Sequence, residues 1–414
     1  MQKKSKSAKA KATFAVSDEP TITELKVSTI IYGDLVEKRE DLKAMMPEFP
    51  TEKLSFIIRN AGAPIANAIR RAVITEVKAK ALTFEVSEVV TNDREIILAE
   101  LLDRISFLVV DQKIPLDTVF SLNKINTSTK KETMQIYARD LVQISGEKLA
   151  TRPFSSTWRI VSLRPEKHIT IPQIRIVEGY GYQHACFSIT SEFKFQVRDF
   201  VDISQLNNRG NVIKGMVRRS ELFSAMKANK VTIPAEFAKT DDLCKPKILI
   251  ISNPDFLKMV NQKDLPKIKA FPTIIETKEV PIYSSLTVDP QEYFLEFITY
   301  GNIRPIELMK MTCDCLIERL EDVSKEENLI IQHDDKKTRI LIKGEDHTIG
   351  NLLKYTIFKL APGIGLVNST LEHPQIRVVT INIIHPEPVK IFRDAAMLLI
   401  AQFQNLKKQF AAHE

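Results

Sequence analysis

One segment of the chain, residues 339–360, changes its hydrophobic period once, and this change limits the structures that it can form. Ile340 and Ile342 alternate with polar neighbours, as in a half-buried strand, whereas the apolar residues after position 348 recur at helical spacing. Asp346 or Thr348 can cap the first turn of that helix. The segment therefore predicts a strand, a tight turn and an amphipathic helix. The predicted turn contains His347, Thr348 and Gly350.

The same unit occurs a second time, nearer the start of the chain. When residues 56–71 are compared with residues 340–355, a shift of 284 residues, several positions are identical without any gap. The helix predicted from residue 64 also keeps an apolar stripe on one face. We therefore predict an internal repeat of a strand followed by a helix. The identical pairs are Ile58 and Ile342, Ile65 and Ile349, and Asn67 and Asn351.

A second pair of segments supports the repeat. Residues 302–323 align with residues 385–406 at a shift of 83 residues, and each segment places a proline at the start of a predicted helix. Large apolar residues then recur at intervals of three and four, which is the spacing of two helices that pack along their length. We predict that the two helices form an intramolecular pairing seam. Its residues are Ile306, Met309, Cys313, Leu316 and Leu320 on the first helix, and Phe392, Ala396, Leu399, Phe403 and Leu406 on the second.

Composition limits the class of protein. The chain has 414 residues, of which 44% are hydrophobic, and this is enough for two or three domains with their own cores. It contains no run of 18 apolar residues, so no segment is predicted to cross a membrane. Its four cysteines form no disulfide framework and indicate a reducing compartment. The net charge of +7 permits contact with nucleic acid or with an acidic partner but establishes neither.

Changes of pattern along the chain predict an α+β protein with two pseudo-symmetric strand-helix dimerisation units and an inserted, mainly β domain. In the insertion, short segments alternate apolar and polar residues between turns. Residues 204–270 fit this scheme only loosely, with one helix expected at 218–230. The predicted divisions are a disordered basic tail (1–18), a discontinuous first unit (19–108 and 280–325), the inserted domain (109–279), a linker (326–336) and the second unit (337–414).

No combination of residues predicts a catalytic, cofactor or metal site. Glu345, Asp346 and His347 are adjacent in a tight turn and diverge, so capping of the helix is favoured over acid-base catalysis. His184 and Cys186 can supply half of a metal site, but the sequence offers no further ligands for it. Neither cluster is predicted to be a site of chemistry.

Arg70 and Arg71 follow Asn67 on the first predicted repeat helix, whose opposite side is apolar. Two interpretations fit this spacing equally well. The arginines belong to a solvated helix face, or they form bidentate bonds with an acidic or backbone-rich partner. The pattern alone does not decide between them.

Several motifs resemble those of the α-like subunits of multisubunit RNA polymerases. Residues 54–77 and 97–110 resemble the start of the third-largest subunit of RNA polymerase II and of its D-type counterpart in archaea. The segment EGYGYQHACFSI (178–189) resembles part of the inserted domain of these subunits. GEDHTIGNLLKYTIFKL (344–360), with LEHP at 371–374, resembles the eleventh subunit or its L-type counterpart in archaea. A chain with both halves is similar to the fused subunit of large cytoplasmic DNA viruses.

The resemblance implies a fold like the amino-terminal domain of bacterial α subunits and a non-catalytic role as the assembly platform of a DNA-dependent RNA polymerase. It implies contact with the largest and second-largest subunits and with a small zinc-binding subunit, whereas DNA and RNA are reached only through the complex. No cofactor and no homo-oligomer are implied. Residues 110–135 contain no cysteine, so the metal loop of some relatives is not expected here. The residues implied at the subunit interface are Asn67, Arg70, Arg71, Glu76, Asn351 and Lys354.

For a viral chain, the resemblance also implies a place of action in the virion and in the viral factories of the host-cell cytoplasm; for any other chain, an intracellular reducing compartment is expected. The alternative to an assembly subunit is a free-standing basic nucleic-acid-binding protein. Such a protein needs surface clusters of basic and aromatic residues, and the sequence does not show them. An assembly subunit is therefore the favoured interpretation.

Overall fold

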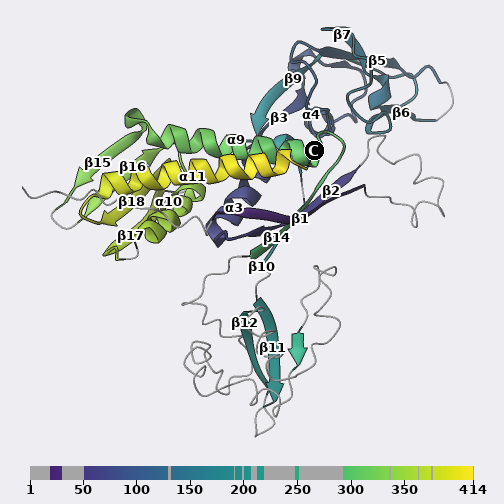
Figure 1. Ribbon diagram of the computed structural model, residues 1–414. Coiled ribbons are helices and arrows are strands. Elements are labelled where there is room, and N and C mark those ends of the chain that lie inside the picture. Colours follow the sequence, from purple (N-terminus) through teal and green to yellow (C-terminus); the bar gives the residue numbers. More distant parts are fainter. Residues whose placement is uncertain are drawn as a thin grey trace, which may run out of the picture.

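The computed structural model describes most of the chain on both sides of the predicted insertion (Figure 1). The predicted basic tail (1–18) and the expected boundary at residue 280 lie outside the described residues. So does the helix expected at 218–230, apart from its first residue. The described residues are 19–29, 51–128, 132–190, 192–197, 200–206, 212–218, 248–250, 292–334, 337–361, 363–373 and 376–413.

Two four-stranded antiparallel sheets have the same topology, and this confirms the internal repeat. In each sheet the strand that precedes the short repeat helix lies second, beside the strand that precedes the long helix. The first sheet has the order β1 (Thr21–Thr29), β2 (Glu52–Arg59), β14 (Glu292–Thr299) and β10 (Phe193–Val197). The second has the order β15 (Leu329–His333), β16 (Thr338–Lys343), β18 (Ile376–Ile384) and β17 (Leu366–His373).

Each half carries one short and one long helix. In the first half, α3 (Ala63–Arg71) widens into a π-helical turn, η2 (Ala72–Glu76), and the long helix is α9 (Pro305–Ser324). Pro64 and Pro305 lie in the first turns, where a missing N–H costs nothing. The second half has α10 (His347–Leu360) and α11 (Pro388–Ala411). The long helices α9 and α11 lie side by side along the middle of the unit that the two halves form together (Figure 1).

One continuous hydrophobic core joins the two halves. All ten residues predicted for the seam between the long helices are buried in it. A second contact in this core also joins the two halves. Phe410 of α11 packs edge-on against Phe56 of β2, with ring centroids 5.2 Å apart. Since the halves share one core, neither buries its apolar face without the other.

The inserted domain has a separate core and begins earlier than the predicted boundary at residue 109. Its sheet has the order β3, β9, β5 and β7, and the amphipathic helix α4 (Leu98–Ser106) packs into the same core. Conversely, β10 lies inside the predicted insertion range but pairs with β14 of the first half. The strands of this domain are β3 (Lys78–Thr83), β4 (Val90–Thr91), β5 (Val119–Ile125), β6 (Met134–Tyr137), β7 (Val142–Ser145), β8 (Arg159–Leu163) and β9 (His168–Tyr180).

Two other expected boundaries differ from the structure. The predicted linker at 326–336 contains β15, which pairs with β16 and so belongs to the second half. Arg218, the expected start of a helix, is the last residue of β12 (Val212–Arg218), which pairs with β11 (Phe200–Leu206). A third strand, β13 (Ile248–Ile250), completes that small sheet. None of the described helices is long and apolar enough to span a membrane.

Candidate functional site

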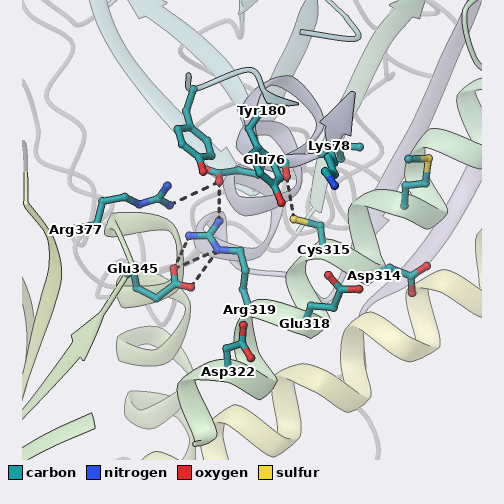
Figure 2. Close-up of a pocket in the computed structure, with 14 residues that line it drawn as sticks. Glu76, Lys78, Tyr180, Asp314, Cys315, Glu318, Arg319, Asp322, Glu345 and Arg377 are labelled. Carbon is teal, nitrogen blue, oxygen red and sulfur yellow. Dashed lines mark hydrogen bonds and ion pairs between the residues drawn. The ribbon is translucent and has the colours of Figure 1, made fainter. Parts of the chain in front are cut away.

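Three motifs that the sequence separates widely meet at a cleft of about 530 Å³ (Figure 2). They are the end of η2 with the start of β3, the GYGYQ segment (179–183) that begins at the end of β9, and the turn between β16 and α10. One face of α9 forms the fourth wall. The residues that line the cleft are Glu76, Val77, Lys78, Tyr180, Tyr182, Met311, Asp314, Cys315, Glu318, Arg319, Asp322, Gly344, Glu345 and Arg377.

Arg319 of α9 lies at the centre of this cleft, with only 13% of its side chain exposed. Its Nε donates to both carboxylate oxygens of Glu345, at 3.2 Å each, and its Nη2 also bonds Glu345 and reaches Asp346 Oδ1 at 3.2 Å. Its Nη1 lies 3.3 Å from Glu76 Oε2. One guanidinium thus connects a carboxylate of the first half with two carboxylates of the second.

Two further arginines extend this network. Arg71, at the end of α3, donates to Asp346 Oδ2 at 2.9 Å and to Thr348 Oγ1 at 2.7 Å. Arg377, on β18 of the second half, lies 3.7 Å from Glu76 Oε2 and stacks over the ring of Tyr182 at 4.7 Å. Each arginine crosses between the halves, and Arg377 also contacts the segment that leaves the inserted domain.

The arginines of this network influence the ionisation of the carboxyl groups that they bind. Burial opposes ionisation of Asp346, but the charge of Arg319 and the N–H of Thr348 outweigh it and lower the pKa to about 2. Asp346 is also the N-cap of α10, because its Oδ1 accepts from Thr348 N at 2.8 Å. Burial raises the pKa of Glu345, and the bonds from Arg319 oppose this effect. Ionised Glu345 therefore depends on Arg319.

Burial favours the protonated thiol of Cys315, the cysteine that lines the cleft. Cys315 donates its S–H to the backbone oxygen of Glu76 at 3.2 Å, and burial raises the pKa of the thiol to about 12. Burial also raises the pKa of Cys313, in the seam, to about 12. In the inserted domain, His184 Nδ1 accepts from Cys186 N, so the pair forms a local turn. Among the described residues, no three His, Cys, Asp or Glu side chains are arranged to hold a metal ion.

The six residues implied at the subunit interface are placed in two different ways. Glu76 is only 5% exposed and points inward, and Arg71 bonds to the second half, so both serve contacts within the chain. The other four are partly or fully exposed on α3 and α10, which contact each other. Arg70 Nε donates to Asn67 Oδ1 at 3.0 Å. The four residues on this surface are Asn67, Arg70, Asn351 and Lys354.

The predicted turn is compact for a steric reason. His347 is exposed, whereas Thr348 and Gly350 are buried. A Cβ on Gly350 would lie 2.4 Å from Ser369 Oγ and 2.7 Å from a methyl carbon of Val379. A side chain at this position would therefore meet residues of β17 and β18, and glycine lets the helix lie close to its sheet.

Sequence reasoning does not single out Arg319 or Arg377, although both are central to the site. α9 carries charged residues on several sides, and only the fold shows that Arg319 faces Glu76 and Glu345. Glu76 is displaced by the π-helical turn, which the helical spacing of 3.6 residues does not predict.

The lowered pKa of Asp346 gives a test by pH. A folded-state pKa below 3.8 means that the charge stabilises the fold above that pH and that this stabilisation is lost as the pH falls toward 2. Asp346→Asn keeps a capping oxygen but removes the charge, so it should cost about 2 kcal/mol at neutral pH and about half as much near pH 3. Urea unfolding at the two pH values measures this. Asp322→Asn, which removes an exposed carboxylate paired with Lys325, is the control and should have little effect at either pH. An equal cost for Asp346→Asn at both pH values would contradict the ionic role.

Comparison with known proteins agrees with the duplicated fold. Residues 55–320 match the family described as RNA polymerase Rpb3/Rpb11 dimerisation domain, and residues 337–409 match a second model with the same description. The chain belongs to the Rpb3/Rpb11 dimerisation family. Its two halves are thus two Rpb3/Rpb11-type domains fused in one polypeptide, and the predicted α+β class is confirmed.

Individual relatives support the same assignment for this Rpb3/Rpb11-type chain. It is similar to the "DNA-directed RNA polymerase RPB3-11 homolog" of African swine fever virus. With isolate Tick/Malawi/Lil 20-1/1983 it is 26% identical over 306 residues, which cover 70% of this chain and 68% of the relative. With strain Badajoz 1971 it is 27% identical over 326 residues, covering 74% and 70%. It is also 33% identical over 81 residues, 20% of this chain, to "DNA-directed RNA polymerase subunit Rpo11" of Sulfolobus acidocaldarius, 88% of which is covered.

Proposed function

We propose that this fused subunit is the non-catalytic assembly platform of a viral DNA-dependent RNA polymerase, acting in the cytoplasm of an infected cell. The observation that carries the proposal is the single core shared by the two family domains, because a pre-paired unit is what a platform must present. The viral relatives that match both halves support the setting. Presence in virions and in viral factories is part of the proposal.

The fusion has a physical consequence for assembly. Tethered halves meet at an effective concentration that is of millimolar order for short connections, so pairing does not depend on two separate pools of protein. The arginine network then fixes the halves in one register. In this proposal the catalytic metal ions and active-site groups belong to the large subunits.

The surface proposed for the large subunits is formed by Asn67 and Arg70 of α3 and by Asn351 and Lys354 of α10. It contains residues of both halves, so only the paired chain presents it whole. Its two cations and two amides suit a partner with carboxylates or exposed backbone carbonyls. We propose that the second-largest subunit binds here, and that the largest and a small zinc-binding subunit join the same complex.

Co-expression with the second-largest subunit tests this surface. Replacing Arg70 and Lys354 together with alanine removes two charged contacts, which at a buried interface cost about 2 to 5 kcal/mol each. The amount of partner recovered with the tagged chain should fall by at least about tenfold. Both residues lie outside the core, so the melting temperature of the free chain should stay within a few degrees.

Arg393→Ala is the matched control for this experiment. Arg393 is an exposed cation of α11 that pairs with Glu326, and it lies outside the proposed surface. Its loss should leave the recovery of partner unchanged. If the Arg70/Lys354 variant also recovers as much partner as wild type, the surface is not the binding site. If purified wild type binds nucleic acid strongly with a steep salt dependence and recruits no polymerase chain, the platform role fails in favour of nucleic-acid binding.

A further inference from the structure

The repeat relates two contacts between the short helices α3 and α10, which we call junctions. The two junctions are equivalent in position, but their residues differ in chemistry. α3 and α10 follow the N-cap residues Gly62 and Asp346, which are related by the repeat shift (346 − 62 = 284). The residue nine positions further along is Arg71 in α3 and Tyr355 in α10 (355 − 71 = 284). At each junction, the later residue of one half meets the N-cap of the other half.

The first junction is ionic. Arg71 of the first half binds the N-cap Asp346 of the second half at 2.9 Å and the hydroxyl of Thr348 at 2.7 Å. Asp346 is further held by Arg319. The carboxylate at this N-cap is therefore needed by two arginines of the opposite half.

The second junction is steric. A Cβ on Gly62 would lie 2.1 Å from Cζ of Tyr355, so the ring occupies the space that any side chain at position 62 would need. The backbone does not require glycine there, because φ is −77° and ψ is 165°, an extended conformation open to all residues. N-cap positions also favour Asp, Ser or Asn over glycine. The glycine is thus explained by the tyrosine of the other half.

We propose that these two junctions form a pairing code: each half accepts the opposite half and rejects a copy of itself. In a pair of two first halves, Arg71 would take the place of Tyr355 and face Gly62, which offers it no carboxylate, and the packing of the Tyr355 ring would be lost. In a pair of two second halves, Tyr355 would face Asp346, whose side chain needs the space of the ring and would lose its arginine. Both like pairs combine a packing fault with an unpaired charge.

A third contact between the halves, the pair of Arg319 and Glu345, also favours opposite halves over like halves. Arg319 of α9 corresponds to Gln402 of α11 (402 − 319 = 83), and Glu345 corresponds to Ala61 (345 − 61 = 284). A pair of second halves would therefore offer a glutamine to a carboxylate that is now buried and paired with Arg319. A pair of first halves would leave Arg319 with Glu76 of its own half but without Glu345 and Asp346. This code concerns the pairing of the halves and holds whichever polymerase chains bind to them.

A double-mutant cycle on the full-length chain measures the complementarity of the second junction. Gly62→Asp should lower the melting temperature by a few degrees, because the new side chain meets the ring of Tyr355. Adding Tyr355→Arg copies the Arg71–Asp346 pair at this junction and should restore most of the loss. Gly62→Asp with Tyr355→Ala removes the ring without supplying a charge, and it should restore clearly less. If Gly62→Asp melts like wild type, or if alanine restores as much as arginine, the proposal fails.

Partner choice is tested with two differently tagged full-length chains refolded together. The Gly62→Asp/Tyr355→Arg variant carries an arginine and an aspartate at the junction of each half, so like halves become compatible there. The fraction of species that carry both tags should rise several-fold above that of wild type at the same concentration. Exchange of opposite halves between chains contributes equally to both samples, so it does not produce this difference. Equal fractions of doubly tagged species would show that the junctions do not select the partner.

Discussion

Replacing Arg319 with methionine is expected to lower the free energy of unfolding by about 3 to 5 kcal/mol at neutral pH. Methionine fills much of the same volume, so the loss measures charge and hydrogen bonding more than packing. Glu345 is the carboxylate most affected, since it is 6% exposed and receives its hydrogen bonds from Arg319. Chemical denaturation of the purified chain gives the value. Arg393→Met, which removes an exposed arginine of α11, should change the stability by less than about 1 kcal/mol.

The pH dependence of this variant identifies the carboxylate. Burial raises the pKa of Glu345, and without Arg319 the main group that opposes this effect is absent. A raised folded-state pKa stabilises the fold below the unfolded value of 4.5 and loses that contribution as the pH rises. The deficit of Arg319→Met should therefore shrink as the pH is lowered from 7 toward about 5. A deficit that stays constant over this range would assign the loss to packing instead.

The paired architecture can be predicted because the spacing of apolar residues along the sequence indicates its strands and helices. The switch from alternating to helical spacing after Ile342 locates β16 and α10, and the intervals of three and four locate the faces of α9 and α11 that are buried. The repeat itself rests on identities such as Asn67 and Asn351. These signals are local, so one sequence is enough to find them.

The start of the inserted domain cannot be predicted in this way. The amphipathic helix α4 has one apolar face, and its sequence does not say which of two cores that face meets. Sequence order places it in the first unit, because it follows the repeat strands directly. β10 is the opposite case, since a short strand of the insertion range completes the sheet of the first half. Both depend on long-range packing, which hydrophobic spacing does not encode.

The ionic part of the site is also hidden from sequence reasoning, for a different reason. Spacing alone fits a solvated face or a partner-binding face for Arg71 equally well, and the family resemblance implies an interface with other polymerase chains. In the structure, its guanidinium bonds to Asp346 of the second half. An arginine opposite an apolar stripe fits both a solvated face and a face that pairs with an acidic partner, so the type of residue does not separate the two. The distinction requires the position of the opposite N-cap, which only the paired fold supplies.

Leu399→Asp should have the largest effect on the paired fold, because it places a charge in the seam between the long helices. Leu399 is fully buried on α11 in the core that contains residues of α9, and no lysine or arginine is among the buried residues of the described part of the chain. Loss of the leucine contacts and burial of an unpaired charge together should cost more than about 4 kcal/mol.

Met397→Asp provides the matched control for this substitution, since Met397 lies on the same helix with 67% of its surface exposed. It introduces the same residue two positions away and should leave the melting temperature nearly unchanged. With Leu399→Asp, thermal unfolding should begin many degrees earlier, and recovery of the second-largest subunit should fall with it, because the proposed docking surface needs both halves. If Leu399→Asp melts like wild type, the long helices do not hold the halves together. If it melts early but still recruits the partner fully, the paired halves are not what the partner recognises.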